Sequence, residues 1–184
     1  MENASKALIM AAEILIGVMI ISFGVYIFNM FGKYSEERHN EIEELQIAEF
    51  NDRFYKFYGT TLNSAGVSRP IECTIHDIVS LANFAQKYNL ENSLIEEKIQ
   101  GNNSYKKIDG VTTTNSLYIQ IDLRGESENL ELKSNSYLVN LIKENDLKED
   151  AQGKKTETKY YKCTVCEPQG GNKRINYVKF EEIK

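Results

Sequence analysis

The chain has 184 residues, of which 41% are hydrophobic and 27% charged, a composition typical of a folded domain rather than a disordered chain. Its 22 basic and 27 acidic residues give a formal net charge of −5, which argues against general nucleic-acid binding because that function needs a basic surface. With 2 Pro and 11 Gly, the chain is neither collagen-like nor a Pro-rich linker.

An apolar segment, residues 7–31, follows a short N-terminal flank, residues 1–6. Its 25 residues carry one charge, on Glu13. About 20 apolar residues cross a hydrocarbon core of roughly 30 Å, so the segment predicts a transmembrane helix with the lipid bilayer as a partner. The apolar core is too long for a cleaved signal peptide, and no small-residue cleavage site follows it.

Glu13 has two interpretations. A carboxylate inside a bilayer costs a few kcal/mol unless it is paired or protonated, so such residues are candidate functional residues. Alternatively, Glu13 lies about one turn inside the apolar segment and reaches the headgroups, where the cost is small. The sequence leaves both interpretations open.

The helix is expected to continue through residues 32–58, which are rich in helix-forming residues and contain no proline. Its apolar positions recur at helical spacing and should pack on the domain that follows. We therefore predict one helix of about 54 residues that stops near Gly59. The positions expected to pack on the head are Ile47, Phe50, Phe54 and Phe57.

Residues 59–184 predict a head that begins with a loop over 60–73. Thr74 and Asp77 form a capping-box pattern that opens a helix, and Asn89 is a candidate for its end. Ser136 is expected to cap a second, shorter helix over residues 137–145.

The rest of the head is expected to be β-rich. Strict alternation over residues 117–123 predicts a half-buried strand. Residues 154–165 and 174–183 predict a C-terminal hairpin, because Pro168 and two glycines lie between them. The fold class is therefore α+β: a long N-terminal helix, half transmembrane and half amphipathic, packed on a small β-rich head with one or two short helices.

Three cysteines offer three kinds of chemistry. A disulfide from Cys73 to Cys163 or Cys166 would close a loop of about 90 residues and is the favoured interpretation. A zinc site of these cysteines with His76 is an alternative, although no second Cys-x-x-Cys supports it. A redox motif is another, but its flanks resemble a strand and a turn rather than a helix N-terminus.

No sequence motif for catalysis is present, including nucleophile-elbow, phosphate-loop, HExxH and EF-hand patterns. We therefore expect no enzyme, no cofactor, no catalytic or metal residues and no small-molecule substrate.

The order of these parts resembles type IV pilins and the pilin-like proteins (pseudopilins) of secretion and competence systems. The resemblance implies that the apolar helices pack into a filament core and that the heads form its outer surface. It also implies that Glu13, as the fifth residue of a mature chain starting at Ile9, sets register against a neighbouring subunit. The family's cleavage motif is not matched, because Leu8 stands where the leader ends in glycine.

Two functions therefore remain. The first is a membrane-anchored structural subunit of a surface filament or pseudopilus that associates with itself or with related subunits. The second is a single-pass, signal-anchored ectodomain that acts as a binding or accessory module without polymerising. Positive charges near the two ends of the apolar segment do not decide its orientation. The resemblance implies a cytoplasmic N-terminus and a head outside the cell membrane.

Overall fold

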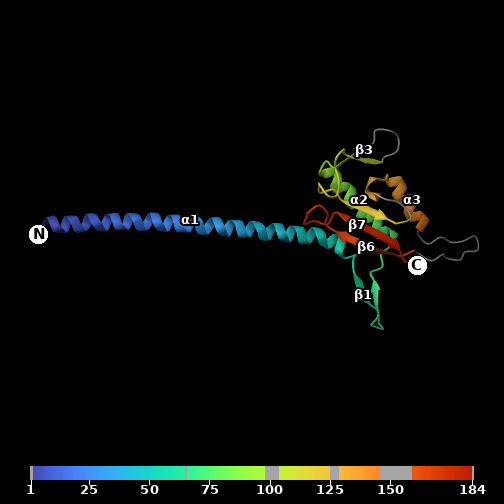
Figure 1. Ribbon diagram of the computed structural model, residues 1–184, viewed down its shortest axis with the longest axis horizontal. Helices are drawn as coiled ribbons and strands as arrows, with labels where there is room; N and C mark the ends of the chain where they lie inside the picture. Colours follow the sequence, from blue (N-terminus) through green and yellow to red (C-terminus); the bar gives the residue numbers. More distant parts are fainter. Residues whose placement is uncertain (1, 65, 98–103, 125–128, 146–158, 184) are drawn as a thin grey trace, which may run out of the picture. The chain divides into compact units, whose positions relative to one another are not determined.

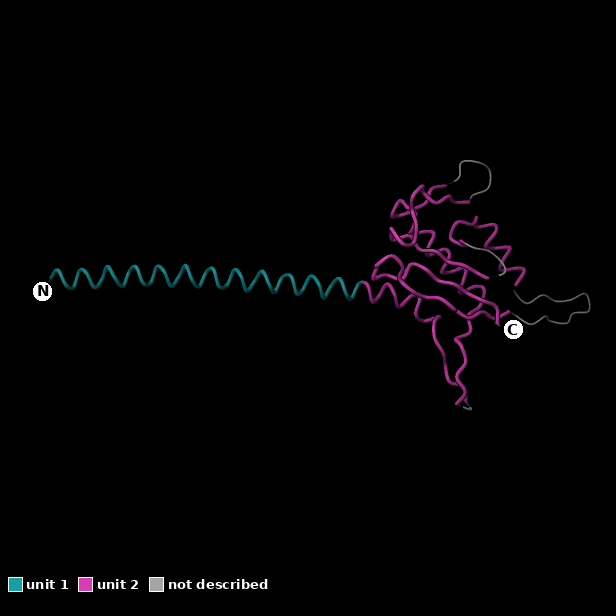
Figure 2. The backbone as a smooth tube through the Cα atoms, viewed as in Figure 1, with its two compact units in different colours: residues 1–46 teal, residues 47–184 magenta. Residues whose placement is uncertain are grey.

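The computed structural model describes residues 2–64, 66–97, 104–124, 129–145 and 159–183 (Figure 1). Residues 154–158 of the predicted C-terminal hairpin lie outside the described residues. The chain forms two compact units, residues 1–46 and residues 47–184, which are coloured separately in Figure 2.

The first unit is entirely helical in its described residues. Helix α1 (Glu2–Tyr55) has 54 residues, which confirms the predicted long N-terminal helix. Its last turns, from Ile47 onward, belong to the second unit. The helix ends before the predicted stop at Gly59, because the amides of Phe57 and Tyr58 bond to carbonyls three residues back, each at 3.0 Å.

The second unit combines helices with small sheets, which confirms the α+β class. Residues 60–73 contain a strand pair where a loop was predicted. The elements after α1 are β1 (Thr60–Leu62), β2 (Ser68–Pro70), α2 (Ile75–Glu91), β3 (Ile95–Glu97), β4 (Tyr105–Lys107), β5 (Gln120–Leu123), the 3₁₀ helix η1 (Leu130–Leu132), α3 (Asn135–Asn145), β6 (Tyr161–Glu167) and β7 (Tyr177–Glu182).

The main sheet has three strands in the order β5-β7-β6. Strands β6 and β7 are antiparallel, as predicted for the C-terminal hairpin. Strand β5 pairs in parallel with β7, with Ile121 opposite Val178 and Leu123 opposite Phe180. A parallel pair needs a crossover connection, and here the chain passes through η1, α3 and β6 before it returns as β7.

Helix α2 begins as its sequence predicts. The Thr74 hydroxyl accepts from the Asp77 amide at 3.3 Å, and the Asp77 carboxylate accepts from the Thr74 amide at 2.9 Å. The helix continues past Asn89 because that side chain is buried and bonds to the backbone of Ile119 in both directions, at 2.8 and 2.9 Å.

The β1–β2 hairpin closes through a polar turn. The backbone amide of Asn63 donates to the carbonyl of Val67 at 3.0 Å, and the Val67 amide donates to the Asn63 side chain at 2.9 Å. The sequence pattern missed this hairpin because its strands are only three residues long and exposed, so no apolar alternation marks them.

Strand β5 is shorter and more deeply buried than the predicted half-buried strand over 117–123. Leu117 is exposed, whereas both Tyr118 and Asp122, on the face expected to be solvated, are buried. The reason is that η1 packs against β5, and its Glu131 accepts from the hydroxyl of Tyr118, which covers part of the face expected to be solvated.

One hydrophobic core joins the sheet to its helices. Buried side chains of α2 and α3 meet those of β5, β6 and β7, and Phe54 of α1 enters the same cluster. Helix α3 begins two residues before the predicted start, so Ser136 lies inside it rather than at its cap; the Ser134 hydroxyl accepts from the Tyr137 amide at 3.2 Å.

Candidate functional site

The apolar part of α1 is the first candidate functional feature. Among the described residues, α1 is the one helix long and apolar enough to cross a membrane by length and composition. None of its most apolar 18-residue window is buried within the structure. The exposed large side chains run from Leu8 to Phe31 and cover all sides of the helix.

Glu13 lies on this exposed apolar helix. Within the described residues it makes no hydrogen bond or ion pair, whereas the nearby Lys6 pairs with Glu2 at 3.2 Å. Beyond the apolar segment, Arg38 bonds to Tyr34 at 3.0 Å and pairs with Glu41 at 3.1 Å. Polar side chains therefore follow the apolar segment directly along the helix.

The end of α1 is attached to the head by aromatic side chains. Phe54 is fully buried, and Phe50 and Phe57 pack against the same core. The Phe50 ring lies 5.6 Å from that of Phe54 and 5.3 Å from that of Tyr88 in α2. Ile47 is half-buried. The structure therefore brings three of the four predicted positions to the core of the head, Phe50 and Phe54 from α1 and Phe57 from the turn that follows it.

Asn51 adds a polar attachment that the sequence pattern missed. Its side-chain amide donates to the carbonyl of Lys173 at 3.0 Å, and its oxygen accepts from the amide of Ile175 at 2.8 Å. The guanidinium of Arg174 lies over the ring of Phe50 at 5.4 Å. The sequence did contain a signal for this contact: Asn51 lies among the aromatic residues of the stripe, and a buried asparagine needs hydrogen-bonding partners.

The three cysteines lie near one another but are free thiols, so the predicted disulfide from Cys73 to Cys163 or Cys166 is wrong. Cys73 and Tyr161 form an isolated antiparallel bridge, which places Cys73 beside β6. The Cys73 thiol donates instead to the carbonyls of Phe57 and Ile71, at 3.8 and 3.9 Å. Among the described residues no group of three or more His, Cys, Asp or Glu side chains is placed to hold a metal, so the alternative zinc site with His76 is not formed.

A buried carboxylate is the second feature that the sequence did not reveal. Glu131 of η1 is fully buried; one of its oxygens accepts from the hydroxyl of Tyr118, and the other accepts from the amide of Ile121 at 2.9 Å. Burial raises the pKa of Glu131 to about 7, against the opposing effect of these hydrogen bonds. The carboxylate therefore links η1 to β5 and the residues before it.

A second buried acid organises the same region. Asp122 accepts from the amide of Asn129 at 2.8 Å and from the hydroxyl of Tyr177 at 3.2 Å. The side chain of Gln86 donates to the carbonyls of Glu131 and Lys133, each at 3.1 Å. The side chains of Glu131, Asp122 and Gln86 are therefore bonded to other groups of the head, and this hydrogen-bond network has a structural role.

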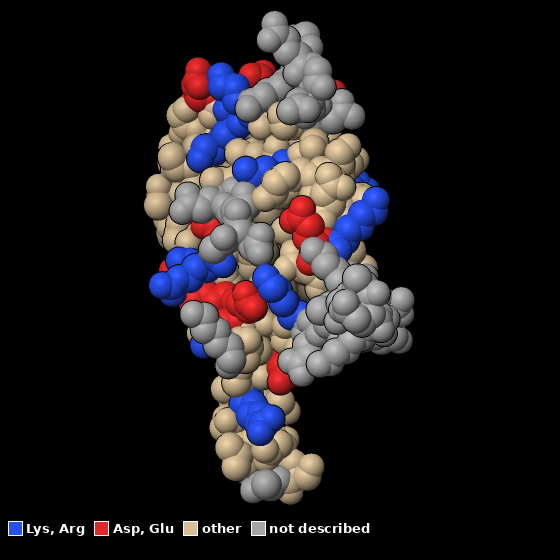
Figure 3. Space-filling model, turned by 90° about the vertical axis from the view of Figure 1, so that its right-hand side faces the viewer, with Lys and Arg blue, Asp and Glu red and all other residues tan. Residues whose placement is uncertain are grey.

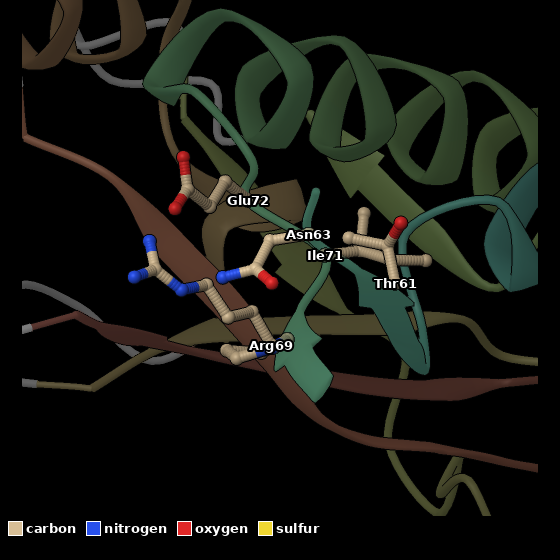
Figure 4. A pocket seen from close by; sticks show the side chains of 6 residues that line it. Thr61, Asn63, Arg69, Ile71 and Glu72 are labelled. Carbon is tan, nitrogen blue, oxygen red and sulfur yellow. The ribbon is translucent and has the colours of Figure 1, made fainter. Parts of the chain in front are cut away.

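An open depression of about 490 Å³ lies at the β1–β2 hairpin. Figure 4 shows the side chains of Arg69 and Glu72 extending toward the same side, while Thr61 and Ile71 lie apart from them. The depression is shallow and lined mainly by one hairpin, so it lacks the enclosed apolar walls typical of small-molecule sites.

The face of the head seen in Figure 3 carries basic and acidic side chains interspersed, and the hairpin at the bottom of that view is mostly uncharged. The described part of this face offers no broad patch of one sign.

Comparisons with known proteins give no relative for this chain: no family model matches it, and neither a curated protein nor a solved structure matches it.

Proposed function

We propose that the chain is a membrane-anchored structural subunit whose apolar helix spans the bilayer and packs beside related helices, as in pilin-like proteins. The observation that carries the proposal is that the two parts of α1 have different surroundings. Residues 7–31 expose apolar side chains on all sides, while Phe54 closes the core of the head without them.

Lipid is the solvent that suits this segment. At 1.5 Å per residue, 25 helical residues span roughly 37 Å, enough for a hydrocarbon core of about 30 Å with some tilt. Burial of apolar surface gains about 25 cal/mol per Å², so each large exposed side chain favours transfer out of water. All backbone groups inside such a helix are bonded, as a bilayer requires.

The proposed orientation places the N-terminus in the cytoplasm and the head outside the cell membrane. It rests on the pilin-like arrangement, because the positive charges near the two ends of the segment, Lys6 with the amino terminus and Lys33 with Arg38, do not decide the orientation. Cysteine-free variants with single reporter cysteines at Ser5 and Ser35 test it. A membrane-impermeant maleimide should label Ser35→Cys, and not Ser5→Cys, in intact cells.

Glu13 is the residue through which the subunits are proposed to align. An unpaired carboxylate in lipid is costly, and in a filament core a donor on the neighbouring helix removes that cost. An interhelical pair in a membrane is worth only about 1–2 kcal/mol, but repetition at every subunit would set the register of a polymer.

A substitution at Glu13 tests assembly separately from anchoring. Glu13→Leu should leave membrane level and head folding unchanged and should lower the amount of protein in sheared surface material. Glu36→Leu, which removes an acid outside the apolar segment, is the matched control and should assemble normally. Equal surface fractions for Glu13→Leu and wild type, or no sheared material from wild type, would contradict the filament proposal.

The depth of Glu13 favours a second candidate function. Glu13 lies six residues after Ala7, which is roughly 9 Å along a helix and within reach of the headgroups. In that case the carboxylate needs no partner, and the chain is a single-pass surface ectodomain that binds or assists other proteins without polymerising. Glu13→Leu would then insert equally well or better, because removal of the charge lowers the cost of transfer into lipid.

In both proposals the head acts as a structural or binding module rather than as an enzyme. The support is the use made of its buried polar side chains. Asn51, Asn89 and Glu131 each bond to backbone groups of another segment and so hold the fold together.

A further inference from the structure

A β-bulge places Cys163 and Cys166 on the same face of β6. Residues three apart in a regular strand point to opposite faces. Here the register shifts between Cys163 and Val165, so Cys163 pairs with Phe180 and Cys166 pairs with Val178. Phe180 and Val178 are both fully buried, and the extra residue in β6 therefore turns both thiols toward that core-facing side.

The pairing also brings the two cysteines close together. Their partners are two residues apart in β7, which corresponds to about 6.6 Å along a strand. Disulfides join Cα atoms roughly 4.4–6.8 Å apart, so the two backbones lie near the upper end of the permitted span. The Cys163 thiol donates to the carbonyl of Val165 at 3.2 Å, within the same short stretch of β6.

Cys73 is chemically set apart from this pair. Its thiol donates to backbone carbonyls, and burial raises its pKa to about 12, which disfavours the reactive thiolate. Within the pair, the interaction between the two thiols lowers the pKa of Cys166 and raises that of Cys163, so Cys166 is the one that more readily becomes a thiolate. Cys163 is the more exposed of the paired thiols, so a small reagent can reach it.

We propose that Cys163 and Cys166 form a reversible dithiol–disulfide site that exchanges with small-molecule disulfides such as oxidised glutathione. One cysteine thiolate attacks a sulfur of the glutathione disulfide, forms a mixed disulfide and releases one glutathione thiolate. The second cysteine, after losing its proton, displaces the other glutathione. The balance is two protein thiols oxidised to one disulfide, one glutathione disulfide reduced to two glutathione thiols, and no other oxidant.

The bridge should be readily reduced. Exposed disulfides are more easily reduced than buried structural ones, and Cys163 is partly exposed, so a thiol can reach its sulfur. The site does not depend on whether the chain polymerises, because both cysteines lie in β6 within the head.

The sequence provides a direct test by peptide mapping. Trypsin cleaves after Lys162 and Lys173, so both cysteines lie in one peptide, residues 163–173, while Cys73 lies in another. The full chain, purified in detergent, is equilibrated with oxidised and reduced glutathione, quenched with acid, alkylated while denatured and digested. We expect peptide 163–173 to lose two hydrogen atoms in oxidised glutathione, and the oxidised fraction to fall about tenfold or more in excess reduced glutathione.

Variants separate this pair from the other pairings. Cys73→Ala should retain the internal bridge of peptide 163–173, and Cys163→Ser should abolish it. Near-ultraviolet circular dichroism checks that both variants keep a native head. A peptide 163–173 cross-linked to the Cys73 peptide, a persistent glutathione adduct in wild type, or a dithiol that survives excess oxidised glutathione would each overturn the proposal.

Discussion

The hydroxyl of Tyr161 donates to the side-chain oxygen of Asn145 at 3.0 Å and so ties the first residue of β6 to the last residue of α3. Both side chains are buried, and the Asn145 amide also donates to the carbonyl of Leu141 at 2.8 Å. The segment between them, residues 146–158, lies outside the described residues. The bond therefore fixes where the chain leaves α3 and where it enters the sheet.

Tyr161→Phe should lower the free energy of unfolding by about 1–3 kcal/mol, because it leaves a buried acceptor on Asn145 unsatisfied. Tyr160→Phe is the matched control, since Tyr160 is 45% exposed and its hydroxyl can bond to water. Chemical denaturation of the detergent-solubilised chain, followed by near-ultraviolet circular dichroism, measures both. Equal midpoints for the two variants would contradict the structural role of the Tyr161 hydroxyl.

Phe54→Ala should cost about 3–5 kcal/mol of head stability, because it opens a cavity in the core that joins α1 to α2. The adjacent Tyr55 is 46% exposed, so Tyr55→Ala should have a small effect and serves as the control. Thermal unfolding of the head reports the difference. A head whose melting temperature is insensitive to Phe54→Ala would mean that α1 does not complete its core.

Glu131→Gln should change how stability depends on pH. The folded protein raises the Glu131 pKa from its ordinary 4.5 to about 7, so the native state binds this proton more tightly than the unfolded state. The contribution of Glu131 to stability is therefore largest below pH 4.5 and is lost as pH rises toward 7. The wild-type melting temperature should fall across this window relative to that of Glu131→Gln.

The control for this titration is Glu181→Gln. The Glu181 carboxylate pairs with Arg124 at 2.7 Å, and the hydrogen bond from Arg124 lowers its pKa. Its contribution is lost as pH falls, opposite to that of Glu131, so its removal should leave the decline between pH 4.5 and 7 intact. If Glu131→Gln and wild type show the same pH profile, Glu131 is not the group that titrates in this window.

Gly170→Ala should destabilise the β6–β7 loop more than Gly171→Ala. Both residues have positive φ, 67° and 77°, so alanine costs roughly 1–2 kcal/mol of backbone strain at either position. A Cβ at Gly170 would also collide with the backbone carbonyl of Thr114, whereas one at Gly171 meets nothing within 4 Å. The denaturation midpoint of Gly170→Ala should therefore be lower than that of Gly171→Ala. Equal midpoints would show that the backbone relaxes easily around a Cβ at position 170.

The sequence predicted the elements whose causes are local. The long helix followed from apolar length and the absence of proline, and the start of α2 followed from the reciprocal pattern of Thr74 and Asp77. The C-terminal hairpin followed from the turn residues between its strands. Each of these depends on neighbours within a few residues, which is the range over which periodicity and capping act.

The parts that sequence reasoning missed depend on distant partners. The parallel pairing of β5 with β7 joins residues more than fifty positions apart, and no local period encodes it. The burial of Glu131 follows from its bonds to Tyr118 and Ile121, which only the folded chain brings together. The disulfide from Cys73 was predicted wrongly because the Cys73 thiol is free and donates to the carbonyls of Phe57 and Ile71, which the spacing of the cysteines does not reveal.

The order of strands also has a consequence for biosynthesis. Strand β7 is the last described strand, yet it occupies the middle of the sheet, where it pairs with both β5 and β6. While a ribosome is still making residues 177–182, β5 and β6 both have unpaired edges, which are templates for aggregation. Nascent heads should therefore depend on chaperones until β7 emerges, although the apolar helix has by then been available to the membrane-insertion machinery for most of translation.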